Sequence, residues 1–301
     1  QAGGEAIAEL LYGRANPSGK LAESWPFTYE DVPSSEIYGK TADALYQEGV
    51  YVGYRYYDKA GVPVRWRFGY GLSYTEFSYA DLTFNGDTVS VSVQNTGKCA
   101  GAEVVQLYME APQDGLHRPL REMKGFQKVF LQPGESRTVT FPLTDRSFAV
   151  WQDGWKIPAG TYAVCVGGLT ASIEKSGETM PIPVWQGGSW YERCTGKPNY
   201  ADWEATLERK YTPPVLKKGS FTMDNTVMEM KEHSLIMKIM FRAVEATIAK
   251  GFGGKKDYEN PEFRMLMNSS AGSPLRSMMI SGGMKGGVLP GMLEMANGHF
   301  F

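Results

Sequence analysis

Apolar and polar residues alternate most regularly between residues 78 and 168. Val89, Val91 and Val93 are separated by polar residues, as in a strand with one face in a core and the other in solvent. Turn-forming pairs stand at Asn85-Gly86, Pro133-Gly134 and Asp153-Gly154, and Asn95-Thr96-Gly97 ends the strand that contains the three valines. The region is therefore predicted to hold about seven short strands, enough for two packed antiparallel sheets.

A helical pattern, with apolar residues three and four positions apart, opens the chain. Apolar residues from Ala6 to Leu11 share one face of a short predicted helix, and Gly13 stands where such a helix ends. Asn16-Pro17-Ser18-Gly19 predicts a type I turn, and Lys20–Trp25 predicts a short strand. These elements are too few to bury the helix face. We therefore expect them to be the end of an α/β layer whose earlier strands lie upstream of the chain.

Two segments with weaker periodicity flank the predicted sandwich. Residues 41–77 are dense in aromatic residues interrupted by glycines, which indicates a folded connector packed against neighbouring layers. Residues 169–222 contain Pro, Gly and Trp, and we expect an ordered strap along the surface.

The last segment, residues 223–301, holds 12 of the 15 methionines and has helical spacing. Thr226-x-x-Glu229 matches a capping box, and apolar residues recur at helical intervals from Leu235 until Gly251. Three further short helices are predicted at Pro261–Asn268, Pro274–Ile280 and Leu289–Asn297. The flexible methionines suit either a partner-binding surface or helices docked on the parent protein, and we favour docking.

The predicted fold is multidomain. Part of an α/β sandwich is followed by an all-β sandwich of immunoglobulin or fibronectin III type and by a small α-helical tail. The expected segments are residues 1–40, 41–77, 78–168, 169–222 and 223–301.

Composition excludes several classes of protein. The formal net charge is −2, so the chain lacks the excess of positive charge that is typical of proteins that bind nucleic acid or anionic membranes. No apolar run is long enough for a transmembrane helix. Cys99, Cys165 and Cys194 are far apart and odd in number, which argues against a disulfide framework or a zinc site. Unpaired thiols favour a reducing compartment, so we expect a cytoplasmic protein rather than a secreted one.

Three ordered stretches resemble glycoside hydrolase family 3. The first resembles the end of the family's α/β sandwich domain, the second its connector, and the third its fibronectin III-like domain. They comprise Gly3–Ala8 with Asn16–Pro26, Glu48–Asp58 with Phe68–Phe77, and Val91–Gly168. The helical tail is similar to extensions on some bacterial members.

The resemblance implies a β-glucosidase-like, retaining, exo-acting glycosidase without a cofactor or metal, whose substrate is a β-linked oligosaccharide or glycoside. The family's nucleophile is an Asp on an N-terminal (β/α)8 barrel, and its acid/base is a Glu of the α/β sandwich domain. Retention requires these carboxyl groups to lie about 5–5.5 Å apart. The resemblance places both upstream, so we expect no catalytic residue in this chain, which would be an inactive structural fragment. Homo-oligomerisation is left open.

The connector holds the candidate substrate-adjacent residues, which are Trp66, Tyr70, Tyr57 and Glu48, and Trp25 of the preceding segment is a further candidate ring. Aromatic rings stack on the C–H faces of sugars, but rings of this kind more often pack in a core. Glu48 and Asp58 could act as an acid or a base or could bind sugar hydroxyls, although structural ion pairs, for example with Arg55 or Arg65, are the more frequent role of such residues.

A second function class remains open from the sequence. The chain could be a non-catalytic β-sandwich interaction module that binds partners through its aromatic and methionine-rich faces. The unpartnered helix near the N-terminus favours the enzyme fragment, because a natural module would not begin with an apolar helix that has nothing to cover it.

Overall fold

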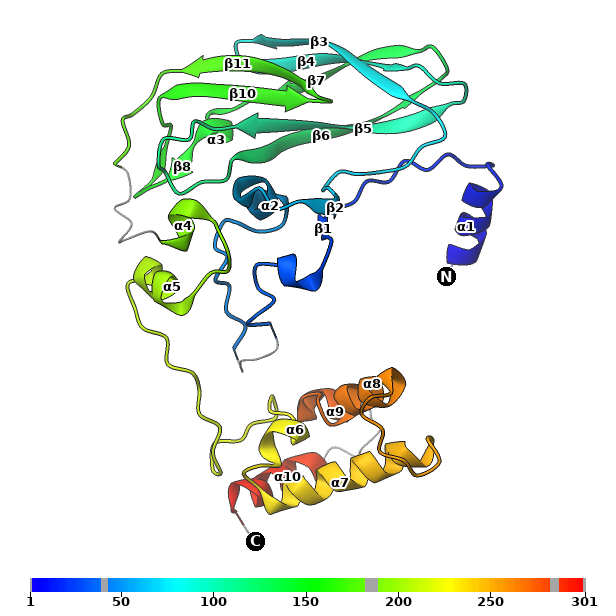
Figure 1. Cartoon of the computed structure of the whole chain (residues 1–301), viewed down its shortest axis with the longest axis vertical. Helices are drawn as coiled ribbons and strands as arrows, with labels where there is room; N and C mark the ends of the chain where they lie inside the picture. The colour runs from blue at the N-terminus through cyan, green and yellow to red at the C-terminus, as the bar shows by residue number, and fades with distance from the viewer. Residues whose placement is uncertain (1, 39–42, 182–188, 282–286, 300–301) are drawn as a thin grey trace. The chain divides into compact units, whose positions relative to one another are not determined.

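The computed structural model describes residues 2–38, 43–181, 189–281 and 287–299 (Figure 1). The chain divides into two compact units, Gln1–Tyr211 and Thr212–Phe301, which are described separately. The boundary that we expected between residues 40 and 41 lies outside the described residues. No helix in the described ranges is long and apolar enough to cross a membrane.

Unit 1 contains the predicted β-sandwich (Figure 1). One sheet has the order β3-β4-β7, the other has the order β11-β10-β5-β6, and all neighbours within them are antiparallel. The strands of the first sheet are β3 Phe77–Asn85, β4 Thr88–Asn95 and β7 Ser136–Pro142. Those of the second are β5 Gly101–Glu110, β6 Arg121–Leu131, β10 Gly160–Val166 and β11 Leu169–Lys175. The β-sandwich prediction is confirmed.

The sandwich core follows the alternation seen in the sequence. Val89, Val91 and Val93 of β4 are fully buried, while the serines between them are not. They share one cluster with Val105 and Leu107 of β5 in the facing sheet. Burial of apolar side chains between two sheets is the main stabilising contribution to such a fold.

The turn predictions within the sandwich are largely confirmed. Gly134 has φ +76°, and Glu135 N donates to Gln132 O, as a type II turn requires. The β3–β4 hairpin exists, but Gly86 and Asp87 form its loop, because Asn85 still pairs with Thr88. The hairpin at Asp153-Gly154 joins β8 Val150–Trp151 to β9 Trp155–Lys156, directly after α3 Asp145–Phe148.

The sandwich extends beyond its expected end at residue 168. Gly167 and Gly168 both have positive φ and form the two-residue loop of the β10–β11 hairpin. A Cβ on Gly167 would lie 2.3 Å from the ring of Tyr79, so this position requires glycine. The segment expected to be a strap therefore begins with β11, and it also contains the short helices α4 Trp190–Arg193 and α5 Tyr200–Leu207.

The first segment forms the predicted helix but not the predicted turn and strand. Helix α1, Gly3–Leu11, ends before Gly13 with φ +69°, and none of its residues is buried. No turn forms at residues 16–19, because the Asn16 side chain instead donates to Ala100 O and accepts from Tyr74 N. The strand is only β1 Trp25–Pro26, and its partner β2 Val64–Trp66 is also short.

The connector is folded, as predicted. Its helix α2, Tyr54–Ala60, contacts β6 of the sandwich. The connector also contributes to a second core, the aromatic cluster, which combines residues that precede the sandwich in the sequence with residues that follow it. The cluster consists of Tyr51, Tyr56, Tyr57, Trp190, Tyr191 and Cys194. A 3₁₀ turn, Tyr29–Asp31, precedes the connector.

Unit 2 is the predicted bundle of short helices. They are α6 Val227–Met230, α7 Leu235–Lys250, α8 Pro261–Ser270, α9 Leu275–Ser281 and α10 Val288–Asn297. The capping box at α6 is confirmed, because Thr226 N donates to the Glu229 carboxylate and Glu229 N donates to Thr226 Oγ1. Met230, Met237 and Met267 are fully buried, so several methionines form its core.

Candidate functional site

Three cavities lie around the connector and the short β1–β2 ladder, and the first is aromatic. Trp25 pairs with Trp66 across the ladder, which brings their ring centroids to 5.7 Å. Tyr70 follows at 6.5 Å from Trp66. These three rings and Leu72 line a largely apolar groove of about 480 Å³. Trp25 is 47% exposed and Tyr70 is 43% exposed, so the groove offers ring faces of the kind that stack on sugar C–H groups.

The second cavity, of about 640 Å³, lies between β1 and the start of α2. Glu48 lines it together with Trp25, Tyr57 and Arg55. Trp25 thus contributes to two neighbouring cavities, whereas Glu48 does not line the aromatic groove.

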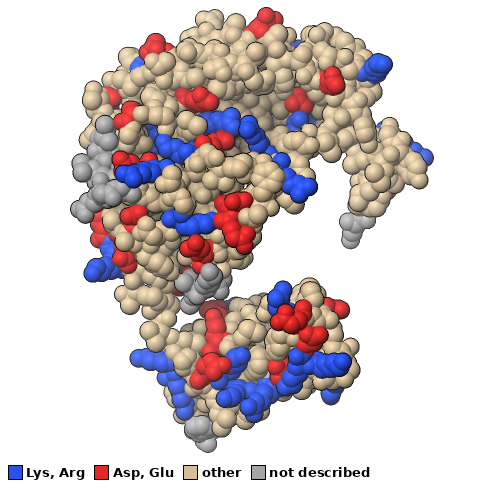
Figure 2. Space-filling model, viewed as in Figure 1, with Lys and Arg blue, Asp and Glu red and all other residues tan. Residues whose placement is uncertain are grey.

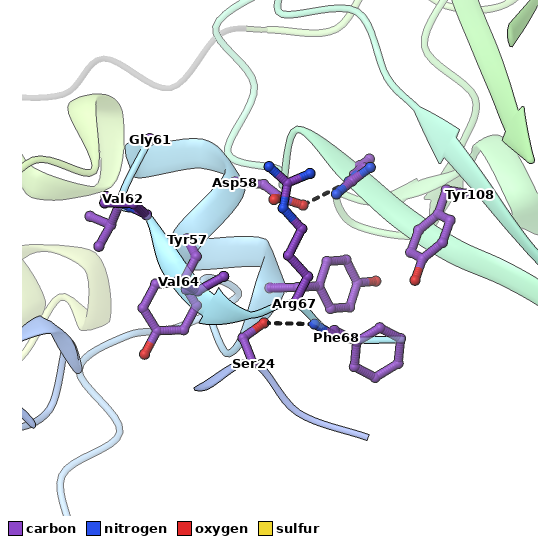
Figure 3. A pocket seen from close by; sticks show the side chains of 12 residues that line it. Ser24, Tyr57, Asp58, Gly61, Val62, Val64, Arg67, Phe68 and Tyr108 are labelled. Atoms are coloured by element: carbon purple, nitrogen blue, oxygen red, sulfur yellow. Dashed lines mark hydrogen bonds and ion pairs between the residues drawn. The ribbon is translucent and has the colours of Figure 1, made fainter. Parts of the chain in front are cut away.

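The third cavity is the most polar of the three and occupies about 370 Å³ between α2 and the strands β5 and β6 (Figure 3). Tyr57 and Asp58 of α2 form one side, and Tyr108 of β5 and Arg121 of β6 form another. Arg121 Nε donates to Asp58 Oδ2 at 2.7 Å, and its guanidinium also lies over the Tyr108 ring. The ion pair therefore joins the connector to the sandwich at the cavity wall.

Burial shapes the electrostatics of this third cavity. It raises the pKa of Tyr57 to about 12, with a smaller effect from the neighbouring Tyr56. It also raises the pKa of Tyr108 to about 12, although the charge of Arg121 acts in the opposite direction. For Arg121 itself burial acts to lower the pKa, but the hydrogen bond and charge of Asp58 raise it overall. The phenols are thus neutral donors at neutral pH, and the guanidinium is charged.

The four candidate residues from the sequence do not form one site. Trp66 and Tyr70 meet in the aromatic groove, Tyr57 lies between the second and third cavities, and Glu48 belongs to the second alone. Asp58 does form a structural ion pair, as expected, but not with Arg55 or Arg65. Asp58 instead pairs with Arg121, because α2 packs along β6.

Arg55 and Arg65 have other partners. Arg55 pairs with Glu122 at 3.4 Å, and the guanidinium of Arg65 lies 4.8 Å from the Trp66 ring centroid. The sequence interpretation missed Arg67, Arg121 and Tyr108 as cavity residues. Only the strand pairing of β5 and β6 brings the last two beside the connector, so no local signal could have identified them.

The described residues include no group of three or more His, Cys, Asp and Glu side chains arranged to hold a metal ion. Cys99 and Cys165 are half-buried and Cys194 is buried, and all three are free thiols.

Two family models match parts of unit 1. Residues 1–54 match the glycosyl hydrolase family 3 C-terminal domain, and residues 103–170 match the fibronectin type III-like domain. The first match covers α1 and β1, and the second covers most of the sandwich.

Curated relatives cover the same part of the chain. Thermostable β-glucosidase B of Acetivibrio thermocellus is 44% identical over 185 residues, which cover 58% of this chain and 24% of that protein. Exo-α-(1→6)-L-arabinopyranosidase of Bifidobacterium breve is 39% identical over 222 residues, which cover 68% of this chain and 28% of that protein. The chain thus spans about a quarter of the length of these relatives.

Solved structures agree with these matches. β-Glucosidase 3B of Thermotoga neapolitana aligns with a TM-score of 0.54 and 42% identity, over 58% of this chain and 27% of that one. A family 3 β-glucosidase of Bifidobacterium adolescentis aligns with a TM-score of 0.56 and 35% identity, over 69% of this chain and 32% of that one. The chain therefore belongs to glycoside hydrolase family 3, of which it carries part of the C-terminal domain and the fibronectin type III-like domain.

Proposed function

We propose that the whole protein is a retaining, exo-acting glycosidase of β-glucosidase type, and that these 301 residues are a structural part of it. The observation that carries this proposal is the identity of 39–44% to a β-glucosidase and an arabinopyranosidase over 185–222 residues. Because the chain spans about a quarter of those proteins, most of the enzyme, including its catalytic carboxyl pair, is proposed to lie in other parts of the whole protein.

The carboxylates of the connector support a structural role for this chain, with the catalytic carboxyl pair in the rest of the protein. A retaining glycosidase needs a nucleophile and a protonated acid about 5–5.5 Å apart across one sugar carbon. Asp58 is held by Arg121, and Glu48 lines a different cavity. Elsewhere, the pKa values of Glu135 and Glu245 are lowered, which is opposite to what a general acid at neutral pH requires.

The aromatic groove suggests how this segment contributes. Trp25 and Tyr70 present exposed ring faces next to the half-buried Trp66, which pairs with Trp25 across the short β1–β2 ladder. In the whole enzyme such rings would line an outer sugar position, while α2 and the sandwich brace the domain that carries the acid. Two relatives are named for different sugars, so an aryl β-glucoside and an aryl α-L-arabinopyranoside are both appropriate substrates for a test.

The test compares purified residues 1–301 with the whole protein on both aryl glycosides. We expect the whole protein to turn over at least one of them and the segment to show no turnover, because loss of the nucleophile removes many orders of magnitude in rate. Turnover by the segment within about tenfold of the whole protein would refute the structural role. Inactivity of the whole protein on all glycosides would refute the glycosidase and favour an interaction module.

A further inference from the structure

The third cavity holds one more positive than negative charge. Its charged lining residues are Arg67, Arg121 and Asp58. Asp58 is already bound to Arg121, so this pair leaves the charge of Arg67 uncompensated within the cavity. A cavity of this kind is complementary to a small ligand with a single negative charge.

Arg67 is placed to meet such a ligand. Figure 3 shows its side chain extending along the cavity toward the end where Asp58 lies. In the described part of the chain, no hydrogen bond, ion pair or ring contact engages the Arg67 guanidinium. Arg65, two residues earlier, differs because it lies over Trp66 and does not line the cavity. An arginine without a protein partner retains all five N–H donors for a planar carboxylate.

The remaining walls suit a hydroxylated ring. Tyr57, Tyr108 and Phe68 supply aromatic surface, and Ser24 Oγ accepts from Phe68 N, which leaves the serine proton free to donate. A volume of about 370 Å³ is at the small end of ligand pockets and fits one monosaccharide-sized molecule.

We propose that this cavity binds a sugar acid, a monocarboxylate with several hydroxyl groups, through a carboxylate–guanidinium pair with Arg67. The single excess charge favours a monocarboxylate over a dianion such as phosphate, and the aromatic walls favour a ring over a bare ion. This binding does not depend on the proposed hydrolytic function, because it concerns a cavity that lies entirely within unit 1.

The test is isothermal titration calorimetry of the 301-residue chain with D-glucuronate at neutral pH and low salt. D-Glucose serves as the uncharged analogue and inorganic phosphate as the anion without a ring. We expect glucuronate to bind with a Kd of about 1 mM, more tightly than phosphate, and glucose to give no measurable heat. Arg67→Gln should weaken glucuronate binding about tenfold or more.

Arg65→Gln is the matched control, since it removes the same charge two residues away and outside the cavity lining. It should change the Kd by less than about twofold. Asp58→Asn removes the cavity's one carboxylate and frees the Arg121 guanidinium, so the net positive charge rises and glucuronate should bind more tightly. Tryptophan fluorescence verifies that each variant is folded. The proposal is overturned if glucuronate shows no binding, if phosphate binds as tightly as glucuronate, or if Arg65→Gln and Arg67→Gln weaken binding equally.

Discussion

Arg121 Nε of β6 lies 2.7 Å from Asp58 Oδ2 of α2, and this ion pair fastens the connector to the sandwich. Both side chains are less than a third exposed, so the pair is better shielded from solvent than a surface salt bridge. Removal of either partner leaves the other charge half-buried without its partner.

Arg121→Gln is expected to destabilise unit 1 by about 1–3 kcal/mol, because Asp58 would lose a charge-assisted hydrogen bond. All seven tryptophans lie in unit 1, so urea unfolding followed by tryptophan fluorescence reports on this unit. Arg137→Gln, which removes an exposed pair with Glu135, is the control and should cost less than about 0.5 kcal/mol. Equal effects of the two substitutions would contradict the fastening role.

Val91→Ala should lower the free energy of unfolding of unit 1 by about 2–4 kcal/mol. Val91 is fully buried between the two sheets, and the truncation leaves a cavity that the packed core cannot fully close. Ser92→Ala, at the next position on the opposite face of the strand, should change stability far less. A Val91→Ala chain with an unchanged urea midpoint would place Val91 outside the core.

The amides of α1 should exchange with solvent rapidly, within the dead time of a manual hydrogen-exchange experiment. The helix has nine residues and no buried side chain, and Ile7 and Leu11 are 59% and 76% exposed. Isolated helices of this length are marginal in water. Mass spectrometry of peptides that cover Ala6–Leu11 and β4 makes the comparison within one sample. Protection of α1 similar to that of β4 would contradict the expectation.

Unit 1 should lose stability steeply above about pH 9. Burial raises the pKa of the Cys194 thiol, and of Tyr57 and Tyr108, to about 12 each, from ordinary values of 9.0 and 10.0. The folded state therefore favours the protonated forms. Their stabilisation is complete below the unfolded pKa values and is lost as pH rises toward 12. Each group contributes a slope of at most about 1.4 kcal/mol per pH unit.

Tyr108→Phe removes one of these groups and should flatten the decline in unfolding free energy between about pH 10 and 12. Tyr12→Phe, at a site that is 81% exposed, should leave the slope unchanged. Urea titrations at several alkaline pH values measure both slopes. Parallel curves for wild type and Tyr108→Phe would show that the phenol is not responsible.

Local patterns predicted the sandwich and the helical unit well. The alternation around Val91 and the capping box at Thr226 depend on neighbouring residues, so they are visible in a single sequence. The predicted turn after Asn16 failed for the opposite reason, because its side chain bonds to Ala100, more than eighty residues away. Strand β11 was missed because the residues from 169 onward were interpreted as a weakly periodic strap, although residues 167 and 168 form a hairpin loop that starts a further strand.

The candidate site was only partly predictable. The high density of aromatic residues correctly indicated the connector. The pairing of Trp25 with Trp66 then brings these two rings and Tyr70 together in one groove. The partner of Asp58 was predicted wrongly, because Arg121 reaches it only through the packing of α2 against β6. Nearness along the chain favoured Arg55 and Arg65, but tertiary packing decided the pairing.

The aromatic cluster has a consequence for the mechanical stability of unit 1 under a pulling force. Tyr51 OH donates to Tyr191 O, and Tyr191 OH donates to Gln47 O, although some 140 residues that include the whole sandwich separate them. These hydrogen bonds link the segment before the sandwich to the segment after it, so the chain between them forms a closed loop that contains the whole β-domain. The two hydrogen bonds act as a clasp, so tension applied at residues 43 and 211 acts on them before it acts on the strands. For the same reason, a single recombination crossover between residues 78 and 168 would join two halves of the aromatic cluster from different parents, whereas an exchange of residues 43–211 would transfer the clasp intact.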